Sequence, residues 1–273
     1  MTDVHLAPSD SLREVYERRG REEYAQPVVP DPSLDRKFAA LTEEIASLLP
    51  ASAYLDAGCG DGRFLAALSA LGPIPCRVVG VDIADSILAT ARRAVAAADL
   101  DAELLRGNLE RLPFEDAEFD LVVSIQVLEH LLDAAAGVRE LARVLRPGGT
   151  LLLSTDNRRR LVSKLLNGPR WLVAGLFRSR NSRVKIAFPH ADFTRRQLVG
   201  LLEDAGLVVE RTRTFRFSVV GASPAMRRLL NRVDARLPDL GVGDILVAVA
   251  RRRADVVRKP ESASADLRRA ESP

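Results

Sequence analysis

The sequence predicts an α/β protein built on a doubly wound, Rossmann-like sheet. Apolar segments of strand length alternate with segments whose apolar residues have helical spacing, which is typical of a parallel sheet covered by helices. The first strand runs into three closely spaced glycines and then a helix, and the second strand ends at an acidic residue. These features predict one α/β unit with a nucleotide-type ligand over the first turn.

The glycine-rich turn after the strand at 53–57 is the most informative segment. Gly58 and Gly60 allow the backbone to turn sharply and to approach a ligand closely. A dinucleotide fingerprint counted from Gly58 would place its third glycine where Arg63 stands. Asp56 puts a carboxylate beside the turn, which repels a pyrophosphate but tolerates an ammonium or a sulfonium. The turn therefore disfavours a dinucleotide-dependent oxidoreductase.

Further segments follow in the order expected for a doubly wound sheet. Asp82 ends the second strand, where an acidic residue can bind ribose hydroxyls, and Asn108 follows the third strand. A fourth strand is predicted at 119–124. The Leu-Arg-Pro-Gly-Gly turn at 145–149 precedes a fifth strand at 150–155. An ordered set of motifs at this spacing is much more specific than any one of them.

Together these motifs resemble the class I S-adenosylmethionine-dependent methyltransferases, in particular the type 11 and ubiquinone-biosynthesis O-methyltransferase-like group. The resemblance covers roughly residues 40–250, including two further strands expected at 207–214 and 244–250. It implies a seven-stranded sheet whose last strand is antiparallel, and S-adenosyl-L-methionine as the cofactor. The residues that it places around the methionine portion of that cofactor are Asp56, Gly58 and Gly60.

The same resemblance implies contacts for the rest of the cofactor. It assigns the ribose to Asp82 and places Ile83 against the adenine. Relatives often carry an aspartate at the position of Asn108, where it accepts a hydrogen bond from the adenine amino group, and an amide oxygen can still accept one. Leu109 is expected to offer its backbone N–H to the ring, and Gln126 to pass close to the methionine moiety.

The candidate catalytic residues follow the fourth strand. In the ubiquinone-biosynthesis enzymes two glutamates and a histidine at this place are associated with a divalent metal, whereas this chain has Gln126, Glu129 and His130. A neutral amide is a poor ligand for a hard cation, so we predict no metal. His130 is the candidate general base, with Glu129 beside it; the alternative is that both only pack or orient the loop. His190 is a second candidate base or a surface histidine.

A basic insertion is predicted at about 157–191, after the fifth strand. It contains nine Lys or Arg residues and no Asp or Glu, although the formal net charge of the chain is only +3. Its apolar residues recur at helical spacing, which predicts one or two amphipathic helices. Such helices can cap the active site, lie on an anionic membrane through 158–185 or contact nucleic acid. Trp171 favours a lipid surface, and base stacking would need more aromatic residues.

Three regions are predicted: a helical N-terminal extension at 1–39, the methyltransferase domain at 40–253 and a disordered tail at 254–273. The extension either covers the cofactor or packs as an ordinary helix; its candidate residues are Tyr16, Arg18, Arg19, Arg21 and Tyr24. Two cysteines are too few for a disulfide framework or a cysteine metal cluster. Without an apolar segment of membrane-spanning or signal-peptide type, we expect a cytoplasmic protein, with peripheral membrane contact left open.

The predicted function is methyl transfer from S-adenosyl-L-methionine to a small-molecule or lipid-like acceptor, with oxygen as the favoured acceptor atom. Residues 124–127 lack the Asn/Asp-Pro-Pro-aromatic motif of the best-known nucleic-acid base methylases, which disfavours nucleic acid. The alternatives are an RNA methyltransferase and a non-catalytic module that binds a membrane or a partner. The sequence leaves the acceptor and the oligomeric state open.

Overall fold

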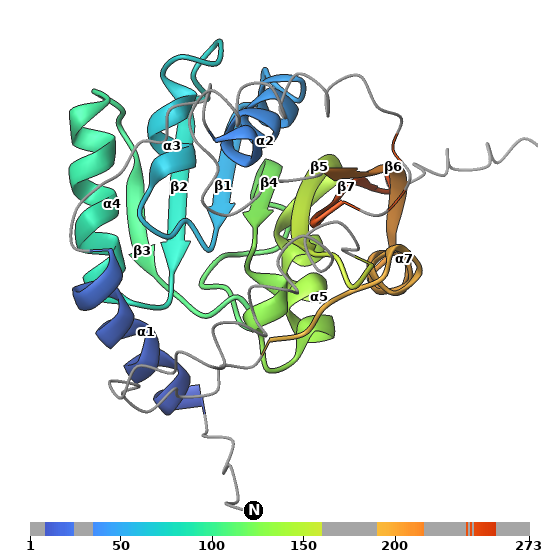
Figure 1. Ribbon diagram of the computed structural model, residues 1–273. Helices are drawn as coiled ribbons and strands as arrows, with labels where there is room; N and C mark the ends of the chain where they lie inside the picture. The colour runs from blue at the N-terminus through green and yellow to red at the C-terminus, as the bar shows by residue number, and fades with distance from the viewer. Residues whose placement is uncertain are drawn as a thin grey trace, which may run out of the picture.

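The computed structural model describes residues 9–24, 35–159, 190–215, 239, 241 and 243–254. These residues form a seven-stranded sheet with the strand order β3-β2-β1-β4-β5-β7-β6 (Figure 1). The strands are β1 (Ala53–Ala57), β2 (Arg77–Asp82), β3 (Glu103–Arg106), β4 (Phe119–Ile125), β5 (Leu145–Asp156), β6 (Leu207–Phe215) and β7 (Ile245–Arg252). The predicted Rossmann-like α/β fold is confirmed.

The strand pairing divides the sheet into a parallel part and an antiparallel edge. β1 pairs in parallel with both β2 and β4, and β7 runs antiparallel to β5 and β6. The antiparallel last strand is therefore confirmed. From β1 the chain passes outward to β2 and β3, and it then returns to the other side of β1 as β4. This reversal creates a topological switch point at the carboxyl ends of β1 and β4, where doubly wound sheets bind ligands.

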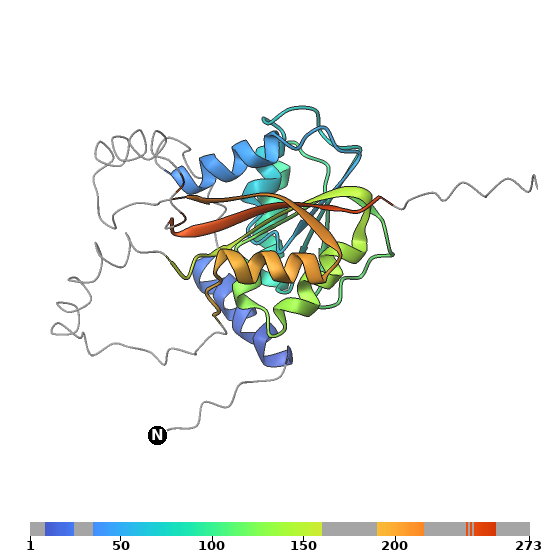
Figure 2. The same ribbon diagram turned by 90° about the vertical axis from the view of Figure 1, so that its right-hand side faces the viewer.

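Helices cover both faces of the sheet (Figure 2). They are α1 (Ser9–Glu23), α2 (Arg36–Ala46), α3 (Arg63–Leu68), α4 (Asp85–Ala97), the short 3-10 helix η1 (Leu128–His130), α5 (Ala134–Val144) and α7 (Arg195–Asp204). Successive strand residues point to opposite faces, so Tyr54 packs in a core with α2, α3 and α4, whereas Leu55 packs with α5 and α7. Burial on both faces explains the continuous apolar runs of the parallel strands.

Helix α1 docks against the start of α4. The Glu17 carboxylate accepts hydrogen bonds from the backbone N–H groups of Asp85 and Ser86, at 2.7 and 3.0 Å, which caps the N-terminus of α4. A Cβ atom on Gly20 would lie 2.2 Å from the hydroxyl oxygen of Ser86, so the close approach of the two helices requires glycine. This contact holds α1 beside the cavity at the carboxyl ends of β1 and β2.

Two element boundaries differ from the prediction. The boundary expected after residue 39 falls inside α2. β5 begins at Leu145 rather than at residue 150, so it includes the Leu-Arg-Pro-Gly-Gly segment. The pairing with β4 shifts in register across this segment: Phe119 pairs with Leu145, and Leu121 pairs with Thr150. Most of the basic insertion and the tail beyond residue 254 lie outside the described residues. Among those described, none of the helices combines the length and apolarity needed to cross a bilayer.

Candidate active site

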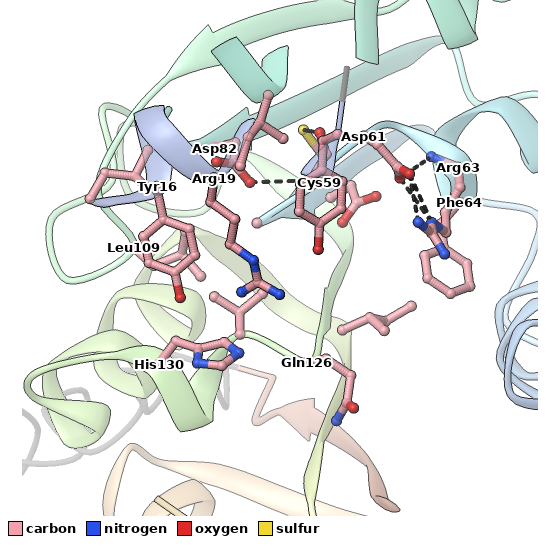
Figure 3. A pocket seen from close by; sticks show the side chains of 18 of the residues that line it. Tyr16, Arg19, Cys59, Asp61, Arg63, Phe64, Asp82, Leu109, Gln126 and His130 are labelled. Atoms are coloured by element: carbon pink, nitrogen blue, oxygen red, sulfur yellow. Dashed lines mark hydrogen bonds and ion pairs between the residues drawn. The ribbon is translucent and has the colours of Figure 1, made fainter. Parts of the chain in front are cut away.

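A cavity of about 410 Å³ opens at the carboxyl ends of β1, β2 and β4, where α1 and α2 border it (Figure 3). Its lining includes His130 and every residue predicted to bind the cofactor: Asp56, Gly58, Gly60, Asp82, Ile83, Asn108, Leu109 and Gln126. Glu129, the other predicted catalytic residue, does not line it. The sheet order thus gathers residues that follow or end four separate strands, β1 to β4, around one space.

The glycine-rich turn is tied to β2 and open toward the cavity. The backbone N–H groups of Gly58 and Cys59 donate to the carbonyl oxygen of Val81, at 2.7 and 2.9 Å. Gly58 has φ +84°, and a Cβ there would lie 2.3 Å from Cγ2 of Val127. Gly60 has φ +56°, and no heavy atom lies within 4 Å of where its Cβ would be. Its backbone can therefore be approached closely by a ligand.

Asp82 stabilises the turn as well as facing the cavity. Oδ2 accepts a hydrogen bond from the backbone N–H of Gly60 at 3.0 Å, and Oδ1 accepts one from that of Ala84 at 3.2 Å. Burial raises the pKa of Asp82 to about 6, although these backbone donors act in the opposite direction. Each carboxylate oxygen keeps a further lone pair with which it can bind a hydroxyl. No local sequence pattern predicts this bond to the turn, because its partners are 22 residues apart.

Asp56 has the electrostatic character expected beside a cationic ligand. Its side chain is 1% exposed, and Oδ2 forms no hydrogen bond within the described part of the chain. Burial, together with the nearby charges of Asp82 and Asp61, raises the pKa of Asp56 to about 8. Asp61 itself is bound by the Arg63 guanidinium at 2.6 Å. A buried carboxyl without a partner fits the ammonium and sulfonium groups of S-adenosylmethionine.

The side chain of Asn108 already forms a hydrogen bond within its own loop after β3. The side-chain oxygen of Asn108 accepts a hydrogen bond from the backbone N–H of Glu110 at 2.9 Å, so it stabilises its own turn. One lone pair of that oxygen remains, and the predicted contact with the adenine amino group uses it. Ile83 and Leu109 supply apolar lining on the same side of the cavity.

A lysine that the sequence analysis did not single out reaches the other side of the cavity. Lys37, in the first turn of α2, donates a 2.6 Å hydrogen bond to Oε1 of Gln126. Burial lowers the pKa of the lysine. Gln126 has φ +56°, and its own backbone N–H donates to the carbonyl oxygen of Ser154 at 3.0 Å. The two partners are 89 residues apart, so no local pattern could reveal their contact.

The two predicted catalytic residues lie in different surroundings. Glu129 is 2% exposed and accepts a hydrogen bond from the Thr155 hydroxyl at 2.9 Å; burial raises its pKa to about 7. Its side chain thus contacts β5 and does not line this cavity, and its place beside the acceptor stays a prediction. His130 does face the cavity, where its ring centroid lies 6.2 Å from that of Tyr16 and 5.4 Å from that of His190.

His190 lies outside the cavity lining, between two carboxylates. Its Nε2 atom is 3.2 Å from Asp156 and 3.5 Å from Asp192. These three side chains are the one group in the described part of the chain that has the composition and spacing of a metal-ligand set, with ligand atoms within 4.8 Å of one another.

Helix α1 supplies part of the cavity wall. Of the five candidates in the N-terminal extension, Tyr16, Arg19 and Tyr24 line the cavity, whereas Arg18 and Arg21 are exposed. Figure 3 shows the Tyr16 hydroxyl directed toward His130, with the Arg19 guanidinium beside it. Burial raises the pKa of Tyr16, so its hydroxyl stays protonated at neutral pH. The extension therefore contributes to the site as well as packing on α4.

The cysteine inside the glycine-rich turn behaves as a packing residue. Cys59 is buried, and both Cys59 and Cys76 are free thiols. Burial raises the pKa of Cys59 well above its ordinary value. A thiol that resists ionisation is a poor nucleophile, which supports packing rather than covalent catalysis at this position.

Residues 55–153 match a family model described as a methyltransferase domain. The order of the sheet, the glycine-rich turn and the acidic ends of β1 and β2 agree with that match. The chain thus has the fold of the class I S-adenosylmethionine-dependent methyltransferases, and the match to a methyltransferase domain covers residues 55–153. Within that class it is similar to the type 11 methyltransferases and to ubiquinone-biosynthesis O-methyltransferases.

Two curated relatives show the extent of the similarity. A protein described as a probable S-adenosylmethionine-dependent methyltransferase from Mycolicibacterium smegmatis is 37% identical over 123 residues, which are 45% of each chain. A ubiquinone biosynthesis O-methyltransferase from Methylocella silvestris is 39% identical over 104 residues, covering 38% of this chain and 40% of the relative. The chain thus spans less than half the length of these relatives.

Solved structures extend the likeness of the fold beyond the matched segment. A methyltransferase in complex with the Trm112 methyltransferase activator from Haloferax volcanii has a TM-score of 0.60 at 19% identity, covering 87% of this chain and 97% of that one. A methyltransferase from Thermotoga maritima, described as a possible histamine N-methyltransferase, has a TM-score of 0.56 at 20% identity, covering 89% and 100%. At these identities the likeness concerns the fold alone.

Proposed function

We propose that this protein transfers a methyl group from S-adenosylmethionine to an oxygen atom of a small-molecule or lipid-like acceptor. The observation that carries the proposal is the buried Asp56 carboxyl, which has no hydrogen-bond partner at Oδ2 and lies beside the open backbone of Gly60. When bound, the cofactor supplies a methyl group on a positively charged sulfur. Asp56 would stabilise the positive charge of the methionine portion, and Asp82 would bind the ribose hydroxyls.

Residues of the same cavity are proposed to contact the adenine of the cofactor and the methyl acceptor. Ile83, Asn108 and Leu109 would hold the adenine, with Gln126 at the boundary between cofactor and acceptor. His130 would accept the proton that an acceptor hydroxyl loses before its oxygen is methylated. Alignment of the reacting atoms in such a cavity can account for roughly 7–11 kcal/mol of barrier lowering. The similarity to a ubiquinone biosynthesis O-methyltransferase supports oxygen as the acceptor atom.

Isothermal titration calorimetry tests the cofactor assignment directly. We expect S-adenosylmethionine and S-adenosylhomocysteine to bind with micromolar affinity, and NAD, as the matched nucleotide control, not to bind. Binding of NAD alone would replace the proposal with a dinucleotide-dependent activity. Binding of none of the three would favour a non-catalytic module that has kept the fold.

The basic segment supports a second, separable part of the proposal, namely peripheral contact with an anionic membrane through residues 158–185. Arg158 and Arg159 are exposed at the end of β5, and the rest of the segment lies outside the described residues. Sedimentation with anionic vesicles should show binding that weakens as salt is raised, whereas neutral vesicles should bind little. Replacing Arg158, Arg159 and Arg160 with Gln should reduce the binding. Equal sedimentation with both vesicle types would contradict an electrostatic contact.

A further inference from the structure

Lys37 is a partly buried cation on the cavity wall. Its ammonium contacts a neutral amide oxygen of Gln126 at 2.6 Å, and in the described part of the chain no carboxylate lies within ion-pair distance of it. Arg63 lines the same cavity, but it is neutralised by Asp61 at 2.6 Å. Removing an ammonium group from water without pairing it is costly, so this arrangement is explained best by a partner that the ligand brings.

The acidic groups around Lys37 are engaged elsewhere. Asp35, Glu129 and Asp156 favour the charged form of the lysine, and Arg63 opposes it. The Asp35 carboxylate caps α2 by accepting a hydrogen bond from the backbone N–H of Phe38 at 3.0 Å. Glu129 has a pKa of about 7, so a large part of it is protonated at neutral pH. Asp156 contacts Nε2 of His190 at 3.2 Å.

The contact between Lys37 and Gln126 also fixes which way the amide points. An ammonium can only donate hydrogen bonds, so the amide atom facing it must be the oxygen, which leaves Nε2 of Gln126 as a donor. That Nε2 is buried and has no hydrogen-bond partner within the described residues. Lys37 also keeps donors beyond the one given to Gln126. The two side chains therefore present hydrogen-bond donors at neighbouring positions on the cavity wall.

We propose that Lys37 Nζ and Gln126 Nε2 together bind an ionised oxygen of the methyl acceptor, so that the acceptor is a phenol-type hydroxyl compound or a carboxylic acid rather than an amine. This inference rests on the proposed methyltransferase function and names the substrate class of that site. Two hydrogen-bond donors that contact an oxyanion stabilise it and lower the pKa of its parent acid. Lys37 thereby becomes a specificity-determining residue for the acceptor.

Binding of simple probes to the protein saturated with S-adenosylhomocysteine tests this proposal. The probes are para-nitrophenol and benzoate, which carry an ionised oxygen, and para-nitroanisole, which has the shape of the phenol without its acidic proton. In the wild-type protein we expect the anions to bind more tightly than the anisole. The absorbance of bound para-nitrophenol should show a lower pKa than that of the free phenol.

Lys37→Met removes the ammonium and keeps the length and apolar stem of the side chain. We expect it to weaken anion binding by at least about tenfold, to leave the anisole unaffected and to abolish the lowered pKa of the bound phenol. Lys37→Arg should restore part of the anion binding. The control is Arg139→Met on the surface of α5, which removes the same charge where the side chain is 61% exposed and should change nothing. A lysine that only orients Gln126 would not shift the pKa of the probe.

The outcomes distinguish a reacting hydroxyl from a carboxylate substituent as the source of the ionised oxygen. They also distinguish failure of this inference from failure of the proposed methyltransferase function. Selective binding of the phenolate would indicate the reacting hydroxyl, and selective binding of benzoate a carboxylate substituent. Equal anion binding by the wild type and Lys37→Met, or no preference of the wild type for anions, would overturn the inference while cofactor binding remained intact. If the wild type failed to bind S-adenosylmethionine, the proposed function would fail instead. Thermal unfolding checks that Lys37→Met is folded, and loss of a desolvated charge should not destabilise it.

Discussion

At the scale of single residues, Asp82 is the residue proposed to bind the ribose, and it also stabilises the protein. Its two oxygens already accept hydrogen bonds from the backbone N–H groups of Gly60 and Ala84. The carboxylate therefore holds the glycine-rich turn in the conformation that brings it close to the cavity. A substitution of Asp82 should therefore weaken ligand binding in two ways: it removes the proposed contacts with the ribose, and it loosens the turn that Asp82 holds in place.

Replacement of Asp82 should separate these two effects. Asp82→Ala is expected to weaken S-adenosylmethionine binding at least about tenfold, because hydrogen bonds to charged groups contribute roughly 1.5–3 kcal/mol. Asp82→Asn keeps one oxygen for the turn and should lose less affinity than the alanine variant. Calorimetry measures the affinities, and thermal unfolding reports how far the turn has loosened. An affinity that is unchanged in both variants would contradict the assignment of Asp82 to the ribose.

At the scale of elements, α1 forms a wall of the site only because it packs closely on α4. Gly20 permits that approach, and Glu17 caps the N-terminus of α4 from the side of α1. Tyr16 and Arg19 then reach the cavity from the same helix. The position of these two side chains thus depends on a helix contact that involves neither of them.

Gly20→Ala should prevent close docking of α1 and weaken cofactor binding. The added Cβ would lie 2.2 Å from the Ser86 hydroxyl oxygen and 2.8 Å from Cγ1 of Ile87, which forces the helices apart. The matched control is Gly200→Ala in α7, where no heavy atom lies within 4 Å of the added Cβ. The control should leave binding unchanged and stabilise the fold by up to about 1 kcal/mol through helix propensity. Calorimetry together with hydrogen exchange in α1 would show both effects; equal cofactor affinities of the two variants would exclude a contribution of α1 docking.

At the scale of the whole molecule, the site places several carboxyl groups in an environment that disfavours their charge. The folded-state pKa is about 8 for Asp56, about 6 for Asp82 and about 7 for Glu129, each raised mainly by burial. Between its ordinary pKa and the raised value, each group binds more protons in the folded state than in the unfolded state. The free energy of unfolding therefore falls as pH rises through this window.

The cofactor-free protein should accordingly lose stability between about pH 5 and about pH 8. Asp56→Asn should reduce this loss, because it removes the carboxyl whose pKa is raised furthest among these three. Saturating S-adenosylmethionine should stabilise the wild type more at the upper end of this range, since a cationic ligand favours the ionised carboxyl. Thermal unfolding across this pH range, with and without cofactor, measures both trends. A wild type and an Asp56→Asn variant with parallel pH profiles would show that Asp56 does not titrate as described.

Local patterns in the sequence determined the class of fold and the position of the cofactor turn. The strands, the glycine-rich turn and the capping box of Thr194 and Gln197 depend on residues that are close in sequence, where periodicity and turn chemistry act. The residues predicted to bind the cofactor lie at strand ends, and the parallel sheet brings such ends together.

Only the tertiary structure decided which distant side chains meet in the cavity. The contact of Lys37 with Gln126 spans 89 residues, and that of Glu17 with Asp85 spans 68, so both depend on how whole helices pack on the sheet. The burial of Glu129 away from the cavity and the raised pKa of Asp56 have the same origin. Desolvation acts on a group only after the surrounding elements have excluded water from it, and no local sequence pattern records which elements those are.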